Sequence, residues 1–386
     1  MIDYFIDVAH KSINKKGEEL CGDNIEIVKT ENGVIIVLSD GLGSGVKANI
    51  LATLTSKIAV TMLKEGATID ETIDTIANTL PECKVRNLAY STFTIIKMNN
   101  NGNCSIVEYD NPAFFLFKKG KDFSVEKKSR IINGKTIYES SFLLEPDDLL
   151  AVVSDGAVHA GIGQSLNLGW QWDSINDFLR IISLKKFAGQ VCTDLLGICN
   201  ELYANQPGDD TTVLAVKLQS LKHLDIFIGP PGNPENDKYL FNNIKTAKGK
   251  TILSGGTTAN IVAKEFGEDI ALDLKDYLSS EVPPIGYLKG VDLVTEGLIT
   301  INKTIKLLKE VYNEKSELLP ENNGAYIVAR MLLYEATHIN IWAGTAVNSA
   351  HQNPDFPIDF NIKLNMISEL EAVLKNLGKV VQLRYL

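Results

Sequence analysis

Two widely separated stretches of the chain repeat one arrangement, in which an apolar run ends in Ser-Asp-Gly. Val34–Leu38 leads into Ser39-Asp40-Gly41, and Leu149–Val153 leads into Ser154-Asp155-Gly156. Continuous apolar runs of this length are typical of buried strands, so each carboxylate is expected at a strand end. A third stretch, Gly208-Asp209-Asp210-Thr211-Thr212, precedes a further apolar run. Carboxylates held in this way, beside glycines that permit a close backbone approach, are suited to hard divalent cations.

Taken singly, each Asp-Gly pair is an ordinary turn dipeptide. For Asp40 alone or Asp155 alone, a simple turn is therefore the favoured interpretation. The pairs occur together with the acidic turn at Asp209 and with an early Cys21-Gly22-Asp23-Asn24 before another strand-like run. This combination favours a common site over independent turns.

The length and charge of the chain limit its class. With 386 residues it exceeds what one hydrophobic core usually organises, so two domains are expected. A net charge of −10 disfavours nucleic acid or an anionic membrane as partner. No window resembles a span of about 20 apolar residues. The five cysteines are odd in number and form no CxxC pair, which favours a reducing compartment; we expect the protein to be cytoplasmic.

The periodicity of apolar residues changes near Ser220, which predicts domains at 1–219 and 220–386. The first half combines many antiparallel strands with two pairs of helices, a pattern that predicts two packed sheets covered by helices. Its expected helices are 48–63, 69–80, 172–184 and 187–203. The second half alternates strands and helices and predicts a smaller α/β domain with a parallel sheet. Its expected elements are strands 224–228, 251–254 and 270–274, and helices 235–246, 259–266, 299–312, 326–337 and 362–377.

The acidic motifs together resemble those of the PPM/PP2C metal-dependent serine/threonine phosphatases, specifically the bacterial branch typified by SpoIIE. The stretch Ser39–Gly45 is close to the hallmark of that branch, and Gly208–Thr212 matches its closing motif. The resemblance covers about residues 1–218 and implies an α+β fold with a PP2C-like α-β-β-α sandwich. Residues 220–386 show no comparable resemblance.

The resemblance also implies a site for two divalent cations, Mn²⁺ or Mg²⁺, between the central sheets. Asp40 would bridge both ions, and the carbonyl of Gly41 would help to hold one. Asp155 and Asp209 would hold the other, and Asp23 would ligate a metal or bind its water. Two such ions can share a water, lower its pKa and offset the phosphate charge. Asp40, Asp155 and Asp209 are therefore the expected catalytic residues, with no side-chain nucleophile and no organic cofactor.

Two positions depart from the pattern of some relatives. A histidine that is a candidate general acid follows the first Asp-Gly in those relatives, whereas Leu42 stands here. No phosphate-binding arginine is evident near the N-terminus, and we expect Lys15 and Lys16 to be solvated loop residues. Asp210 is expected beside the metals and not as a ligand.

The resemblance implies a protein phosphatase that hydrolyses phosphoserine or phosphothreonine on a cytoplasmic regulatory protein, by attack of a metal-bridging water. An anti-sigma-factor antagonist is the substrate class it suggests, and a homodimer is the assembly. The alternative is a non-catalytic scaffold or sensor that keeps the shape of a phosphatase domain. Metal binding and turnover would distinguish the two.

The second domain carries one further motif, Ser254-Gly255-Gly256-Thr257-Thr258, at a strand-to-helix junction. Free N–H groups at a helix N-terminus, together with threonine hydroxyls, could hold a small anion near Gly255–Thr258. A plain helix cap with glycines chosen for tight packing is the favoured alternative. Gly229–Gly232 could line the same edge of the sheet. We expect this domain to be regulatory or ligand-binding and to act through the helix that follows Asp40.

Overall fold

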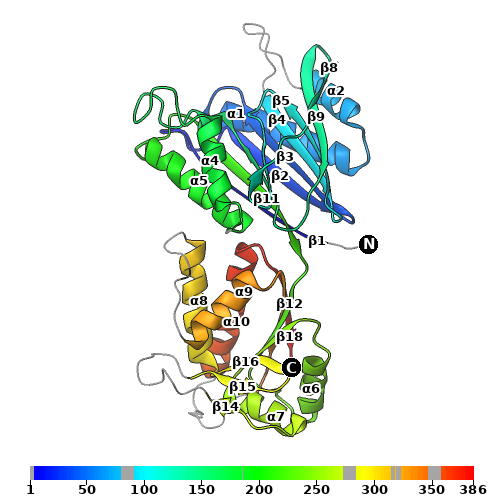
Figure 1. Ribbon diagram of the computed structural model, residues 1–386, viewed down its shortest axis with the longest axis vertical. Helices are drawn as coiled ribbons and strands as arrows, with labels where there is room; N and C mark the ends of the chain where they lie inside the picture. Colours follow the sequence, from blue (N-terminus) through cyan, green and yellow to red (C-terminus); the bar gives the residue numbers. More distant parts are fainter. Residues whose placement is uncertain are drawn as a thin grey trace. The chain divides into compact units, whose positions relative to one another are not determined.

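The computed structural model describes residues 4–79, 91–184, 186–272, 284–313, 318, 323–346 and 358–386. The chain divides into two compact units, Met1–Ser220 and Leu221–Leu386. They are described separately below (Figure 1).

The described part of the first unit is built on two antiparallel sheets. One has the strand order β1 (Tyr4–Ile13), β11 (Thr211–Ser220), β10 (Leu149–Val153), β6 (Phe115–Lys118) and β7 (Lys121–Asp122). The other has the order β2 (Asp23–Thr30), β3 (Gly33–Gly41), β4 (Ser91–Asn99), β5 (Asn103–Tyr109), β9 (Lys135–Leu143) and β8 (Lys128–Ile132). Loop turns at Glu31-Asn32 and around Asn99–Asn103 join neighbouring strands, so local hairpins set much of this register.

Side chains alternate across β3 and so place the two sheets between helical layers. Ile36 and Leu38 face the other sheet in a core shared with Val152 and Leu214. Ile35 and Val37 face the opposite way. They pack with α1 (Gly45–Lys64) and α2 (Ile69–Thr79).

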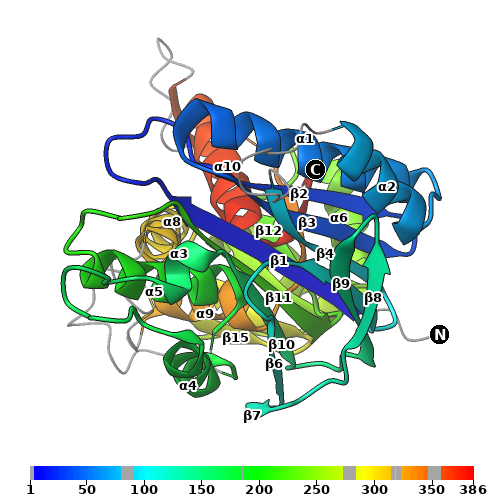
Figure 2. The same ribbon diagram turned by 90° about the horizontal axis from the view of Figure 1, so that it is seen from above.

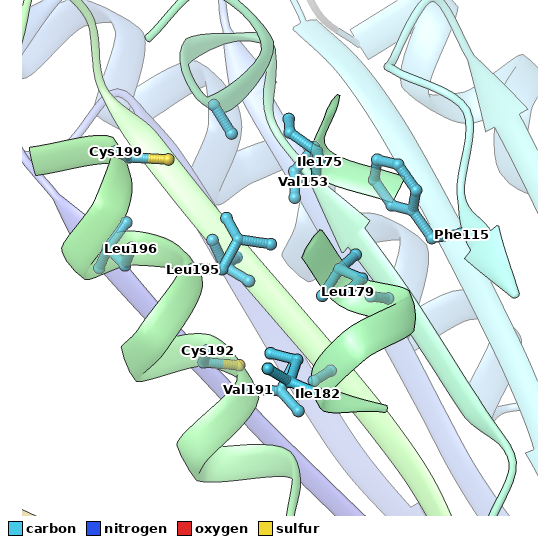
Figure 3. Close-up of a cluster of buried hydrophobic side chains, with 14 of the residues drawn as sticks. Phe115, Val153, Ile175, Leu179, Ile182, Val191, Cys192, Leu195, Leu196 and Cys199 are labelled. Carbon is cyan, nitrogen blue, oxygen red and sulfur yellow. The ribbon is translucent and has the colours of Figure 1, made fainter. Parts of the chain in front are cut away.

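The outer face of the other sheet is covered by α4 (Trp172–Ile182) and α5 (Ala188–Leu202). Figure 3 shows Leu179 and Leu195 of these helices directed at Val153 and Phe115 of the sheet. The layers are therefore α-β-β-α, as Figure 2 shows. This confirms the predicted α+β sandwich and its four main helices, within one to three residues at the ends that the structure describes; Leu80, the predicted end of α2, lies outside those residues.

Helix α1 requires a correction to the sequence analysis. Among the described residues it is the helix that is long and apolar enough to cross a membrane, judged by length and composition alone. Its apolar residues are explained in part by the sandwich, because Ala48, Leu51, Ala52 and Ala59 are buried against the sheet.

The second unit contains a mainly parallel sheet. Its strand order is β14 (Ala271–Leu272), β15 (Gly286–Leu288), β16 (Val291–Thr295), β13 (Lys250–Ser254), β12 (His223–Ile228), β17 (His338–Ala343) and β18 (Val380–Tyr385). Its helices are η1 (Pro234–Asn236), α6 (Asp237–Lys245), α7 (Gly256–Phe266), α8 (Leu298–Tyr312), α9 (Gly324–Tyr334) and α10 (Ile358–Asn376). Figure 1 shows α6 and α7 on one face of this sheet and α8, α9 and α10 on the other.

The five strands β16, β13, β12, β17 and β18 pair in parallel. Counted along the chain, their order is 3-2-1-4-5, which is the doubly wound arrangement with a reversal of strand order beside β12. The predicted α/β class is confirmed. The strand expected at 270–274 is described only as Ala271–Leu272, which pairs antiparallel with β15, and its remainder lies outside the described residues.

Candidate metal centre

The first part of the site is formed by neighbouring strands of one sheet. Asp23 in β2 and Asp40 in β3 are direct cross-strand partners, and Asp40 also pairs with Thr92 in β4. Because side chains of directly opposite residues project to the same face, this register brings the two carboxylates together. The Cys-Gly-Asp-Asn and Ser-Asp-Gly motifs therefore meet in space.

The second part comes from the other sheet. Asp155 begins a short helix, α3 (Asp155–Val158), directly after β10 and Ser154, while Asp209 and Asp210 precede β11. Two hydrogen bonds between Ser154 and Thr212 join the end of β10 to the start of β11. The N–H of Ser154 donates to the carbonyl of Thr212 at 3.0 Å, and the hydroxyl of Ser154 accepts from the N–H of Thr212 at 2.8 Å. The neighbouring strands β10 and β11 thus present their acidic residues at one end of the sandwich.

The two parts face a common cavity of about 220 Å³. Its acidic lining consists of Asp40, Asp155, Asp209, Asp210 and Asp110. The remaining lining residues are Gly41, Leu42, Gly43, Ser91, Thr92 and Tyr109. Asp23 lies buried below this lining, with 5% of its surface exposed.

Close backbone packing explains the glycines of the motifs. A Cβ at Gly41 would overlap the carbonyl oxygen of Ala48 in α1, and a Cβ at Gly156 would overlap the carbonyl oxygen of Asp210. A Cβ at Gly22 would lie 2.8 Å from Oδ2 of Asp210. These glycines therefore allow the strand ends to approach the helix and one another.

The electrostatics of the cluster are those of crowded, buried carboxylates. Burial, followed by the charges of Asp23, Asp155 and Asp209, raises the pKa of Asp40 to about 9. Burial is the main cause that raises the pKa of Asp23 to about 7. Burial and Asp209 also raise the pKa of Asp155, which His159 partly offsets. Asp23, Asp40 and Asp155 are thus held where a negative charge is unfavourable without a cation.

Unpartnered oxygen atoms test whether these residues suit a cation. Both carboxylate oxygens of Asp23 and Oδ2 of Asp210 are buried and have no hydrogen-bond partner within the described ranges. Buried polar atoms are normally paired, so these three oxygens are open to a ligand. Oxygen-only donors of this kind suit Mg²⁺ or Mn²⁺ rather than zinc or copper. The residues present therefore fit the predicted ions.

The carboxylates are not already gathered into a ready coordination sphere. Across the described ranges, no three His, Cys, Asp or Glu side chains lie together closely enough to hold one metal ion. The ligand roles of Asp23, Asp40, Gly41, Asp155 and Asp209 stay predictions.

Two residues near the site differ from the sequence expectation. Lys15 is not simply solvated: its Nζ lies 3.5 Å from Oδ1 of Asp209, and its N–H donates to Oδ1 of Asp210 at 3.0 Å. Asp210 lines the cavity with a free oxygen, which its second position in the Asp-Asp pair did not reveal. The early loop that carries Lys15 is far away in sequence, so only the β1–β11 pairing could have signalled the contact.

The geometry of the described residues does not favour a side-chain nucleophile. Cys21 is the cysteine nearest to the motifs in sequence. Burial and the neighbouring Asp23 raise its pKa to about 12, so its thiol stays neutral. Ser91 lines the cavity, but its hydroxyl donates to the carbonyl of Asp40 at 2.8 Å. The chemistry this site can perform is therefore that of carboxylates and of whatever cations they hold.

Comparison with known protein families identifies the class of the first unit. Residues 30–219 match the family model described as stage II sporulation protein E (SpoIIE). Together with the α-β-β-α layers, this match defines the unit as a PP2C-type phosphatase domain. Within that class, the domain belongs to the SpoIIE family, which confirms the resemblance found in the sequence. No curated protein sequence matches the chain.

Several solved structures are similar to part of the chain. The phosphatase domain of SpoIIE from Bacillus subtilis is 21% identical, with a TM-score of 0.44 over 57% of this chain and 95% of that one. The RsbU and RsbW domains of a Mycobacterium tuberculosis protein are 15% identical, with a TM-score of 0.47 over 63% and 68%. RsbX in complex with magnesium is 18% identical, with a TM-score of 0.41 over 57% and 100%. Since these TM-scores lie below 0.5, the assignment depends on the family match.

Proposed function

We propose that the first unit is a divalent-cation-dependent protein phosphatase that hydrolyses phosphoserine or phosphothreonine. The observation that carries the proposal is the meeting of acidic strand ends from both sheets at one cavity, with buried carboxylate oxygens left unpartnered. Two Mn²⁺ or Mg²⁺ ions bound there would supply positive charge to offset the phosphate and would make a water more acidic.

The residues of the chain have distinct parts in this proposal. Asp40, between Asp23 and Thr92 in the sheet, would hold both ions, and Gly41 would add its carbonyl oxygen. Asp155 and Asp209 would hold one ion from the other sheet. Lys15, already 3.5 Å from Asp209, adds positive charge at the rim where a phosphate would approach.

The test measures hydrolysis of p-nitrophenyl phosphate and of a phosphoserine peptide by the full chain, with Mn²⁺ and with EDTA. Asp155→Asn should lower the rate at least about 100-fold, since it removes one charge from the metal ligands. Asp147→Asn is the matched control, because Asp147 is exposed at a positive φ of 75° that asparagine also tolerates. Equal loss in both variants, or equal activity in EDTA, would refute the proposal.

A non-catalytic scaffold is the second candidate, and one observation favours it. No ready metal cluster is present in the part of the chain that the structure describes. Calorimetric titration with Mn²⁺ separates the candidates. Saturable binding that Asp155→Asn weakens supports the phosphatase, whereas no heat of binding together with no turnover supports the scaffold.

The substrate and the regulation belong to the same proposal. The SpoIIE family suggests a phosphorylated regulatory protein of the anti-sigma-factor antagonist type as substrate, in the cytoplasm, and a homodimer as assembly. Control is proposed to pass through α1, because Gly41 packs directly on Ala48 and a shift of α1 would move the end of β3. Helix α1 also exposes Val46, Ile50 and Leu54 along one side.

Polar substitution of that exposed side tests the regulatory part. Val46→Ser, Ile50→Ser and Leu54→Ser combined should change the phosphatase rate of the full chain while its melting temperature in Mn²⁺ stays within about 2 °C, as expected for exposed positions. An unchanged rate would contradict a regulatory role of this surface.

A further inference from the structure

The second unit places a glycine after each of four adjacent parallel strands. Gly344 follows β17, Gly229 follows β12, Gly255 follows β13, and Gly297 lies two residues after β16. Backbone hydrogen bonds continue the sheet through these positions: Gly344 donates to Ile228, Gly229 to Ser254 and Gly255 to Thr295, at 2.9–3.0 Å. Glycine backbone therefore borders the carboxyl edge of the sheet at these four positions, and this is the edge where doubly wound sheets bind ligands.

Two helices begin at this edge with the same local sequence pattern. Gly255 is the N-cap of α7 and Gly297 the N-cap of α8, and neither helix has a side-chain cap or an acidic residue in its first turn. A Cβ at Gly297 would lie 3.7 Å from Cα of Gly255, so the two N-termini meet. The first N–H groups of both helices and their dipoles thus converge on one place.

The third residue of each helix supplies an independent observation. Thr258 in α7 and Thr300 in α8 are both fully buried, and neither hydroxyl has a hydrogen-bond partner among the residues that the structure describes. A Cβ on Gly255 would lie 3.5 Å from Oγ1 of Thr258 and 3.8 Å from Cα of Gly229, so the hydroxyl is close to both glycines. A buried hydroxyl without a hydrogen bond costs free energy, so the Thr258 hydroxyl is available to a ligand at the glycine backbone.

A buried cation lies at the same edge. Lys363 of α10 is 8% exposed, and its Nζ donates to the carbonyl of Gly344 and rests against Gly229. No carboxylate pairs with it among the described residues, and burial lowers its pKa. Buried lysines are normally paired with an anion.

One polar group at this edge accepts hydrogen bonds, whereas the others donate them. Oε2 of Glu296, between β16 and α8, is also buried and has no hydrogen-bond partner in the described part of the unit. A carboxylate accepts hydrogen bonds from hydroxyl or amino groups, whereas helix N-termini, threonine hydroxyls and a lysine donate to phosphate oxygens. A ligand that satisfies all of them carries a phosphate at one end and a hydroxyl or amino group near it.

We infer that the second unit binds a phosphate ester of a polyhydroxyl compound, a nucleotide or a sugar phosphate, with its phosphate on the N-termini of α7 and α8. This extends the anion cradle expected at Gly255–Thr258 to a second helix, Lys363 and Glu296. The edge has neither the lysine of a P-loop nor the glycine spacing of a dinucleotide site. A single phosphate group is therefore the unit that it recognises.

The first experiment is calorimetric titration of the full chain in EDTA, so that the metal centre of the first unit cannot hold phosphate. The probes are AMP, ribose 5-phosphate, glucose 6-phosphate, adenosine and inorganic phosphate. At least one ester should bind at least tenfold more tightly than inorganic phosphate, and adenosine should bind at least tenfold more weakly than AMP. If no ester binds below millimolar concentration, or inorganic phosphate binds equally well, the inference is overturned.

The second experiment uses two threonines of one helix as a matched pair. Thr300→Val should weaken binding of the best ester at least tenfold and leave the melting temperature without ligand unchanged or raised. Thr304 is equally buried, but its hydroxyl already donates to the carbonyl of Thr300 at 2.8 Å. Thr304→Val should therefore lower the melting temperature and leave the affinity within twofold. The reverse pattern would overturn the inference.

Gly256→Glu and Lys363→Met provide tests from the two sides of the phosphate. A Cβ at Gly256 meets nothing within 4 Å, so glutamate fits there and puts a negative charge on the N-terminus of α7. Both variants should bind the ester at least tenfold more weakly. Lys375→Met, on the exposed side of α10, is the control and should bind normally. Wild-type affinity in both test variants would exclude this edge as the site.

Discussion

Replacing Asp40 with asparagine should stabilise the chain in the absence of metal and remove its response to metal. Asp40 stands among Asp23, Asp155 and Asp209, and burial with these charges raises its pKa from 3.8 to about 9. At pH 7 the folded chain must hold a proton that the unfolded chain would release. From 3.8 to pH 7 this costs about 4 kcal/mol at about 1.4 kcal/mol per unit.

The expected gain is smaller than this cost because the neighbouring carboxylates titrate together with Asp40 and stay in place. Asparagine is neutral without taking up a proton, so the replacement removes about half of the cost, or about 2 kcal/mol. For a unit of this size the melting temperature should rise by about 4–8 °C in EDTA. The wild type should gain about 2.7 kcal/mol from metal at about 100 times its Kd, and the variant should gain none.

The assay is differential scanning calorimetry of the full chain at pH 7 and pH 5, in EDTA and in Mn²⁺. Between pH 3.8 and about 9 the folded Asp40 binds more protons than the unfolded chain, so wild-type stability in EDTA falls as pH rises. The advantage of Asp40→Asn should therefore shrink to about 1 kcal/mol at pH 5. Asp173→Asn, at an exposed position of α4, controls for the loss of one charge. Destabilisation by Asp40→Asn in EDTA, or a retained Mn²⁺ shift, would refute the reasoning.

The remaining predictions concern the packing that holds the acidic strand ends. Gly156→Ala should cost about 1–3 kcal/mol in urea unfolding, because its Cβ would overlap the carbonyl of Asp210. Gly197→Ala should instead add about 0.5–1 kcal/mol by the same measurement, since Gly197 lies inside α5 with open space around its Cβ. Tyr203→Phe should cost about 1 kcal/mol and weaken Mn²⁺ binding in calorimetry, because the hydroxyl of Tyr203 donates to the carbonyl of Gly156 at 2.8 Å.

The acidic site of the first unit could be located from sequence because its residues mark strand ends. An apolar run that stops at Ser-Asp-Gly predicts both a strand and the place where it ends. The pairing of Asp23 with Asp40 follows from the hairpin between β2 and β3, which a short loop sets locally. Asp155 shows the limit of this reasoning: Ser154 and Asp155 are residue types that favour a helix start, but the same Ser-Asp-Gly at Asp40 stays in a strand.

The sheet of the second unit could be predicted only in part. Strands β12 and β13 are close in sequence and buried, so their apolar residues identify them. Strands β16, β17 and β18 were not anticipated. β18 alternates weakly and is largely exposed, and β17 pairs with β12 across more than a hundred residues of chain. Such pairing depends on tertiary packing, which strand propensity does not encode.

Hydrogen-bond partners explain why neither site could be completed from residue types alone. Thr300 and Thr304 are identical residues one turn apart on α8, yet only the hydroxyl of Thr304 is paired. In the same way Asp210 differs from an ordinary turn residue only by its buried, free oxygen. The two sites also differ in the sign of their charge, because carboxylates surround the first, whereas helix N-termini and Lys363 dominate the second. A cation should therefore saturate the first unit alone, and a phosphate ester in EDTA should bind only the second.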